Sequence, residues 1–344
     1  MQTFLGIDYP TLWFLVVGAL FSGYAILDGF DLGAGAWHLF FRDEDHRRVA
    51  LNAVGPVWDG NEVWLVIGGG ALFAGFPEAY ATLFSAMYIP FILFLGFLIF
   101  RAVSIEFRGK EPMKWWRRTW DISYSVSSAA MALLLGVVLG NVLIGISMDD
   151  QFVFRGHWLE FLNPYALSVG VTTLLLFMVH GAIYLTMKTE GQLFDQVSRL
   201  LWRSILIFVG AFIIVTLISF FYFPHLTDRF MESPVLLIVP LLAFLSIANV
   251  PRLASKKKYV RSFIFSALSI SFLLIVVAIE LYPVILLDRP ETGNSMTIYN
   301  AASSDKALGI MLTITAIGLP LVIFYTVFVY RTFWGKVKLD EMSY

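Results

Sequence analysis

Cysteine is absent from this chain of 344 residues, and histidine is scarce, with only five. A chain without cysteine has no disulfide, no thiolate-ligated metal and no covalently attached c-type haem. The sequence also has no G-x-x-x-x-G-K-[ST] phosphate loop, no H-E-x-x-H zinc motif and no G-x-S-x-G nucleophile motif. The common signatures of soluble hydrolases and nucleotide-binding enzymes are therefore missing.

Charge is also scarce, because only 14% of the residues are charged and 58% are hydrophobic, against roughly 25% charged in ordinary soluble domains. The net charge of −1 gives no reason to expect a nucleic-acid partner. Apolar runs such as residues 91–100 and 205–221 do not alternate in polarity as strands of a membrane barrel would. The sequence therefore predicts an all-α integral membrane protein.

Nine transmembrane helices can be placed in one membrane domain that covers residues 1–344. We expect two four-helix bundles, within about 1–146 and 164–284, and one peripheral helix at 307–331. The N-terminus lacks the basic region of a signal peptide and is expected to be retained. The expected spans cover residues 11–40, 50–73, 79–101, 119–146, 164–187, 202–223, 235–250, 261–284 and 307–331.

The basic residues of the connections lie mostly on one side of the membrane in this arrangement. All but four of the 24 Lys and Arg residues fall in the odd-numbered connections or the C-terminal tail, with Arg101 and Arg108 assigned to the third connection. Cytoplasmic loops carry an excess of Lys and Arg. We therefore expect the N-terminus outside and the C-terminus in the cytoplasm.

Two pairs of acidic residues lie inside the first two expected spans. Asp28 and Asp31 belong to GYAILDGFDLGAG, and Asp59 and Glu62 belong to PVWDGNEVWL. Each pair is spaced i, i+3, which places both carboxylates on one helix face. Ionised carboxylates in hydrocarbon cost several kcal/mol and usually serve a function. The pattern predicts a titratable cluster in the cytoplasmic half of the membrane that could pass protons inward.

A purely structural interpretation of these acids stays open. Asp31 and Asp59 could instead cap helices or pair with Arg47, Arg48 or Arg101 at the membrane edge. No histidine lies three or four residues from the four acids, so we do not expect a metal site there.

Two further polar residues lie within the expected spans. His180 is the one histidine clearly at membrane depth, which leaves no facing pair for haem, and we expect it to be hydrogen-bonded packing. Glu280, near the external end of the eighth span, could pair with an external arginine or reach water.

GYAILDGFDLGAG followed by NAVGPVWDGNEVWLVIGGGALFAGFPEAYA resembles subunit II of the cytochrome bd-type quinol oxidases, over essentially the whole chain. That family oxidises membrane quinol outside and reduces O₂ to water with protons from the cytoplasm. The resemblance implies a bacterial cytoplasmic membrane and a partner subunit I that holds two haems b and one haem d. It also implies that this chain contributes no haem ligand. The further partners that it implies are membrane quinol, the lipid bilayer and a small accessory membrane subunit.

The resemblance also implies roles for individual residues. Asp28 and Asp59 would be the main proton-conducting carboxylates, with Asp31 in support. Trp58 and Trp64 would lie at the subunit interface or along an O₂ path. The chain departs from some relatives at Val57, where they have histidine, so a proton relay through that position must differ here. Glu62, where some relatives have Gln, either adds a carboxylate to the route or is a neutral replacement.

Two other interpretations remain. A secondary transporter could couple H⁺ or Na⁺ to solute movement through the same aspartates, but it should have broken helices in matching positions of its two halves. The glycine and acid cluster occurs only in the first half. A subunit that serves purely as a scaffold would have no titrating groups in its mechanism.

Overall fold

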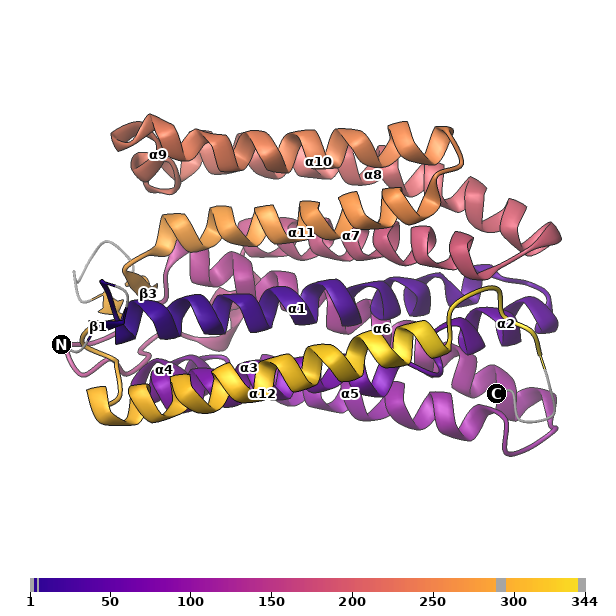
Figure 1. The fold of residues 1–344 in the computed structure, drawn as a ribbon, viewed down its shortest axis with the longest axis horizontal. Coiled ribbons are helices and arrows are strands. Elements are labelled where there is room, and N and C mark those ends of the chain that lie inside the picture. Colours follow the sequence, from indigo (N-terminus) through magenta and orange to yellow (C-terminus); the bar gives the residue numbers. More distant parts are fainter. Residues whose placement is uncertain (1–2, 5, 289–294, 340–344) are drawn as a thin grey trace.

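The computed structural model describes residues 3–4, 6–288 and 295–339, and these form an elongated bundle of long helices (Figure 1). Helix α1 (Tyr9–Trp37) runs through the middle of the bundle. Its start is set by Asp8, whose carboxylate accepts a hydrogen bond from the amide of Thr11 at 2.9 Å, and by Pro10 in the first turn. An acidic N-cap followed by proline is a strong helix-start signal.

The remaining elements follow in chain order. Two short hairpins lie at the end of the bundle where α1 begins: β1 (Thr3–Phe4) pairs with β2 (Ile7–Asp8), and β3 (Val284–Leu286) with β4 (Met296–Thr297). The other α-helices are α2 (Glu44–Val54), α3 (Trp58–Gly75), α4 (Pro77–Ala86), α5 (Tyr88–Arg108), α6 (Lys114–Ile144), α7 (Pro164–Lys188), α8 (Gly191–Tyr222), α9 (Asp228–Glu232), α10 (Ile238–Ser255), α11 (Tyr259–Leu281) and α12 (Asp305–Thr332).

Within the described residues, eight helices are each long and apolar enough to cross a membrane. The ninth candidate is a bent pair, α3 and α4, whose axes meet at 119°. Seven of the expected spans match single helices, although α8 begins at Gly191 and not at residue 202. The chain is a mostly helical multi-pass membrane protein.

The expected spans 50–73 and 79–101 were wrong in detail. The first expected span is divided between α2 and α3. The second is divided between α4 and α5, which are separated at Met87. A proline ring clashes with the carbonyl four residues earlier in a continuous helix. Pro56, Pro77 and Pro90 each lie at or within three residues after one of the breaks.

The centre of the bundle is the packing of α1 against α7. At this crossing a side chain on Gly33 would collide with the backbone of Phe177, and one on Gly181 with the backbone of Ala34. Glycine at both positions lets the two backbones approach closely, as in other membrane helix pairs.

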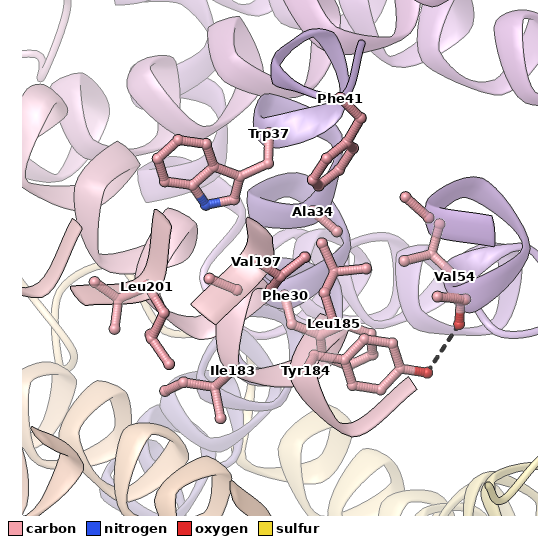
Figure 2. Packing of buried hydrophobic residues seen from close by; sticks show 14 of the residues in the cluster. Phe30, Ala34, Trp37, Phe41, Val54, Ile183, Tyr184, Leu185, Val197 and Leu201 are labelled. Atoms are coloured by element: carbon pink, nitrogen blue, oxygen red, sulfur yellow. Dashed lines mark hydrogen bonds between the residues drawn. The ribbon is translucent and has the colours of Figure 1, made fainter. Parts of the chain in front are cut away.

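Aromatic side chains fill the core beside the crossing. The ring of Phe30 stacks on Tyr184 with centroids 4.0 Å apart, and the Tyr184 hydroxyl donates to the carbonyl of Ala53 at 3.0 Å (Figure 2).

Helix α12 lies at the edge of the bundle (Figure 1). Only 6% of its apolar window is buried inside the chain, against 56% for α7. It packs against α1 and α3 and leaves large side chains such as Phe324 and Phe328 exposed. A helix that is apolar on its outer face suits contact with lipid or another membrane subunit.

Candidate functional site

Arg101 lies at the centre of a charged site inside the bundle. Its side chain has no exposed surface, and its guanidinium contacts both oxygens of Asp28, with Nη2 to Oδ1 at 2.6 Å and Nη1 to Oδ2 at 3.2 Å. Nη1 also donates to Oε2 of Glu62 at 3.1 Å. Helices α1, α3 and α5 each contribute one member, and a buried arginine fork matched to a carboxylate is a strong, directional pair.

The assignment of Arg101 and Arg108 to a connection between spans was therefore wrong. Helix α5 continues to Arg108, and both side chains are buried. The apolar residues after Arg101, namely Ala102, Val103 and Ile105, continue the helical pattern and could have indicated this. Arg199 and Arg203, assigned to the fifth connection, likewise lie within α8.

Asp31 lies on the same helix as Asp28 and is equally buried, but its partner is neutral. Nδ2 of Asn61 donates to its Oδ2 at 2.7 Å, and the same amide donates to the carbonyl of Leu27 at 3.2 Å. The hydroxyl of Tyr330 on α12 donates to Oδ1 of Asn61 at 3.0 Å. The other oxygen of Asp31, Oδ1, is buried and has no hydrogen-bond partner among the described residues.

We call Asp28, Asp31, Asn61, Glu62 and Arg101 the acid site. Asp59 is not bonded to this group. It lies exposed on the surface of the chain and has no hydrogen-bond or ion-pair partner among the residues that the structure describes. Asp59 precedes Glu62 by one helical turn, and the two carboxylates are close enough to repel each other. Of the four predicted acids, the structure buries Asp28 and Asp31, half-buries Glu62 and leaves Asp59 outside.

A second charged group, the end cluster, lies at the far end of the bundle from the N-terminus. Asp121 on α6 accepts from Nε2 of His38 at 2.6 Å and from Nε of Arg108 at 2.6 Å, and Nε of Arg47 lies 3.1 Å from it. These contacts tie together the ends of α1, α2, α5 and α6. The end cluster comprises His38, Glu44, Arg47, Arg108, Arg117 and Asp121.

Glu44 completes the end cluster from α2. Its carboxylate lies 2.9 Å from Arg108, 3.0 Å from Arg47 and 3.4 Å from Arg117. Partial burial raises the pKa of Glu44, but hydrogen bonds and charge from Arg47 and Arg108 outweigh it and hold the pKa below its ordinary value.

Comparison with known proteins identifies the family. The sequence model of the family "Cytochrome bd terminal oxidase subunit II" matches residues 9–333. The chain belongs to this family.

Named relatives support the assignment. The chain is 32% identical over 335 residues to "Cytochrome bd ubiquinol oxidase subunit 2" of Bacillus subtilis (strain 168), covering 97% of this chain and 98% of the relative. It is 29% identical over 371 residues to "Cytochrome bd-I ubiquinol oxidase subunit 2" of Escherichia coli (strain K12), covering 98% of each. A solved chain, from "The structure of bd oxidase from Geobacillus thermodenitrificans", has the same fold, with a TM-score of 0.79 at 20% identity over 94% of this chain and 98% of that chain.

Trp58 and Trp64, the two tryptophans predicted at the subunit interface or O₂ path, are both buried within this chain. Trp58 lies beside the acid site, with the guanidinium carbon of Arg101 6.0 Å from its ring centre. Trp64 packs over Gly23 of α1, where a larger residue would collide with the indole. Next to Trp64, an apolar cavity of about 360 Å³ lies between α1, α3 and α12, with Trp13 and Leu319 also in its lining.

The polar residues outside the acid site differ in their contacts. His180 on α7 is buried, its Nε2 donates to the carbonyl of Ile26 at 3.1 Å, and its Nδ1 lies 2.9 Å from the hydroxyl of Ser266. It is hydrogen-bonded packing, as expected. Glu280 makes no ion pair among the described residues, and both of its carboxylate oxygens are buried without a hydrogen-bond partner there. Of the two possibilities left open for Glu280, an ion pair with an external arginine is not seen among the described residues.

The two buried histidines, His38 and His180, are held by contacts within the chain. Both ring nitrogens of His180 are engaged, and Nε2 of His38 is bound to Asp121. Across residues 3–4, 6–288 and 295–339, no group of three or more His, Asp or Glu side chains could hold a metal ion.

Proposed function

We propose that this chain is subunit II of a bd-type quinol oxidase in a bacterial cytoplasmic membrane. Its partner, subunit I, would hold two haems b and one haem d, and the complex would oxidise membrane quinol and reduce O₂ to water. This chain would stabilise subunit I and conduct protons from the cytoplasm. A small accessory membrane subunit is a further candidate partner. Family membership supports this division of roles.

We further propose nine spans with the N-terminus outside and the C-terminus in the cytoplasm. The start of α1 and the end of α12 lie at opposite ends of the bundle, as an odd number of crossings requires (Figure 1). The bent pair α3 and α4 would be the ninth span. The two proposed four-helix groups, α1, α3, α5 and α6 and then α7, α8, α10 and α11, would pack on each other through the contacts of α1 and α6 with α7, in one domain with α12 peripheral.

The observation that carries the proton role is the charge balance of the acid site. Three carboxylates, Asp28, Asp31 and Glu62, lie around one cation, Arg101, and no second cationic side chain pairs with them among the described residues. An excess of negative charge inside a membrane is costly. Protons are the simplest counter-ions that can restore neutrality, so the site is built to take them up and release them.

The geometry suggests an order for the proton route. Asp59 lies at the surface of the chain and would receive protons from the cytoplasm. Glu62, one turn further along α3 and with 14% of its side chain exposed, would pass them to the interior beside Asp28 and Arg101. Asp28, whose carboxylate pairs with Arg101, and Asp31 in support would be the inner members of the route.

Trp58 and Trp64 would shape the environment of this route. Trp58 covers one side of the Arg101 guanidinium. Trp64 borders the apolar cavity beside α12, which suits a path for O₂ or a contact with subunit I.

Conservative replacements test the proposal. Asp28→Asn and Asp59→Asn should each slow quinol-dependent O₂ consumption by the purified oxidase by about tenfold or more, the scale of a lost proton-transfer group. The haem absorption spectrum should stay intact. Glu78→Gln is a matched control, because Glu78 is exposed on α4 and makes no described contact. Normal turnover in both aspartate variants would leave only the scaffold role.

The transporter alternative is less well supported. A bent pair of membrane helices occurs in the first half of the chain, and the described part of the second half contains no counterpart. Inverted-repeat transporters are expected to break helices in both halves.

A further inference from the structure

Tyr330 is the point where the peripheral helix α12 reaches the acid site. Its hydroxyl donates to Oδ1 of Asn61 at 3.0 Å, across 269 residues of sequence. Its ring lies edge-on to Phe30 of α1, with centroids 6.3 Å apart. Tyr330 is thus placed against both α1 and α3, although most of α12 faces outward.

Two acceptors, Oδ2 of Asp31 and the carbonyl of Leu27, fix which way the Asn61 amide points, and the hydroxyl of Tyr330 completes this arrangement by donating to its Oδ1. Nδ2 of Asn61 uses both of its hydrogens, one toward Oδ2 of Asp31 at 2.7 Å and one toward the carbonyl of Leu27 at 3.2 Å. A flipped amide would place its oxygen against those two acceptors and its NH₂ against the hydroxyl. With Tyr330 as donor, one orientation satisfies all four groups.

Asp31 and Asp28 differ in how readily they can accept a proton. Both oxygens of Asp28 are occupied by the Arg101 guanidinium, so a proton there must displace an ion pair. Asp31 uses only Oδ2, and its Oδ1 has no hydrogen-bond partner among the described residues. A proton can be added to Oδ1 and removed again without breaking a described contact.

The chain after α12 holds Tyr330 in position. Nζ of Lys336 donates to the carbonyls of Thr186 and Thr189 at 3.1 and 2.8 Å, and the amide of Val337 donates to the carbonyl of Lys188 at 2.9 Å. These carbonyls lie at the C-terminal end of α7, where helical acceptors have no partner within the helix. The end of α12 is therefore fastened to the central helix α7.

We propose that Tyr330 is a positioning residue for proton transfer at Asp31, acting through the Asn61 amide. Asp31 takes a proton on Oδ1 from the cytoplasmic side of the route and releases it inward, and Tyr330 keeps its own proton throughout. This inference rests on the proposed role of the acid site in proton conduction. It assigns to α12 a function beyond lipid or subunit contact.

The test removes one hydroxyl in the purified oxidase complex. Tyr330→Phe should lower turnover per haem about 3- to 10-fold, the range expected for one lost hydrogen bond. It should also change the pH profile of turnover at saturating quinol, which a loss of assembled enzyme cannot do. The quinol KM and the haem spectrum should stay the same. Tyr325→Phe is the matched control, because Tyr325 is exposed on the same helix and makes no described hydrogen bond.

Two further variants, Asn61→Ala and Asp31→Asn, distinguish a failure of this inference from a failure of the proposed proton route. In an Asn61→Ala background, Tyr330→Phe should cause no additional loss, because its effect passes through the amide. Normal turnover and pH profile in Tyr330→Phe, or an equal loss in the Asn61→Ala background, would overturn the inference. If Asp31→Asn slows the enzyme while Tyr330→Phe does not, the inference alone fails. If Asp31→Asn is as active as the wild type, the proposed role of Asp31 in the route fails as well.

Discussion

The acid site and the end cluster are both built around a buried arginine of α5, yet their charge balance is opposite. Arg101 and Arg108 are seven residues apart, so they share a face of the helix. Around Arg101 the carboxylates exceed the cations, because its guanidinium pairs with Asp28 and Glu62 while the nearby Asp31 is bonded to the neutral Asn61. In the end cluster the cations exceed the carboxylates, because Asp121 and Glu44 pair with three arginines, namely Arg47, Arg108 and Arg117.

This difference separates a structural group from a site that exchanges protons. Each carboxylate of the end cluster pairs with at least two cationic side chains, so its charge is balanced without a proton, although Oδ2 of Asp121 also has no hydrogen-bond partner among the described residues. In the acid site, Asp31 makes no ion pair with a cation among the described residues, and its Oδ1 has no hydrogen-bond partner there. Buried ion networks with complete partners hold helices together, whereas incomplete ones are more often functional.

The largest effect should come from Arg101→Met. This change leaves Asp28 buried without a cation beside the half-buried Glu62, and removing one partner of a buried pair costs about 3–5 kcal/mol. We expect little assembled oxidase, measured as haem-containing complex recovered from the membrane. Adding Asp28→Asn should restore part of the assembly but not the turnover. Full activity of the double variant would show that the Arg101 pair is only structural, like the end cluster.

The second prediction concerns Asp121→Asn in the end cluster. Loss of the charge weakens the bonds from His38 and Arg108, which should lower the stability of the complex by about 1–3 kcal/mol. Thermal loss of the haem absorption measures this. Turnover per haem should stay unchanged, in contrast to Asp31→Asn. Asp45→Asn, exposed at the same end, is the control, and reduced turnover in Asp121→Asn would extend the proton route to the end cluster.

The sequence predicts the acid site only in part. Asp28 and Asp31 were found because spacing along one helix places them on one face. Arg101 was missed, because a basic residue after an apolar run is usually the end of a span, and only its carboxylate partners keep it inside. Tyr330 was missed because tyrosine near a membrane surface is usually an anchor, and its partner Asn61 is distant in sequence.

Proline in the sequence predicts only some of the helix breaks. Pro90 accounts for the separation of α4 from α5 at Met87, but Pro251 and Pro320 lie inside α10 and α12 without ending them. In a membrane bundle, neighbouring helices can satisfy the carbonyl that a proline leaves free. Whether a proline breaks a helix thus depends on tertiary packing, which local sequence does not contain.

The smallest expected effect is the acid sensitivity of the end cluster through Glu44. Since its pKa is lowered in the folded protein, Glu44 stabilises the fold above its unfolded pKa of about 4.3, and this contribution is lost as the pH falls through the lower folded value. The carboxylate is 35% exposed, so solvent screening keeps the contribution below about 1 kcal/mol. Glu44→Gln should lower thermal stability slightly at pH 7 and make the loss between pH 7 and acid conditions shallower. An unchanged pH dependence would mean that Arg47 and Arg108 are balanced by Asp121 alone.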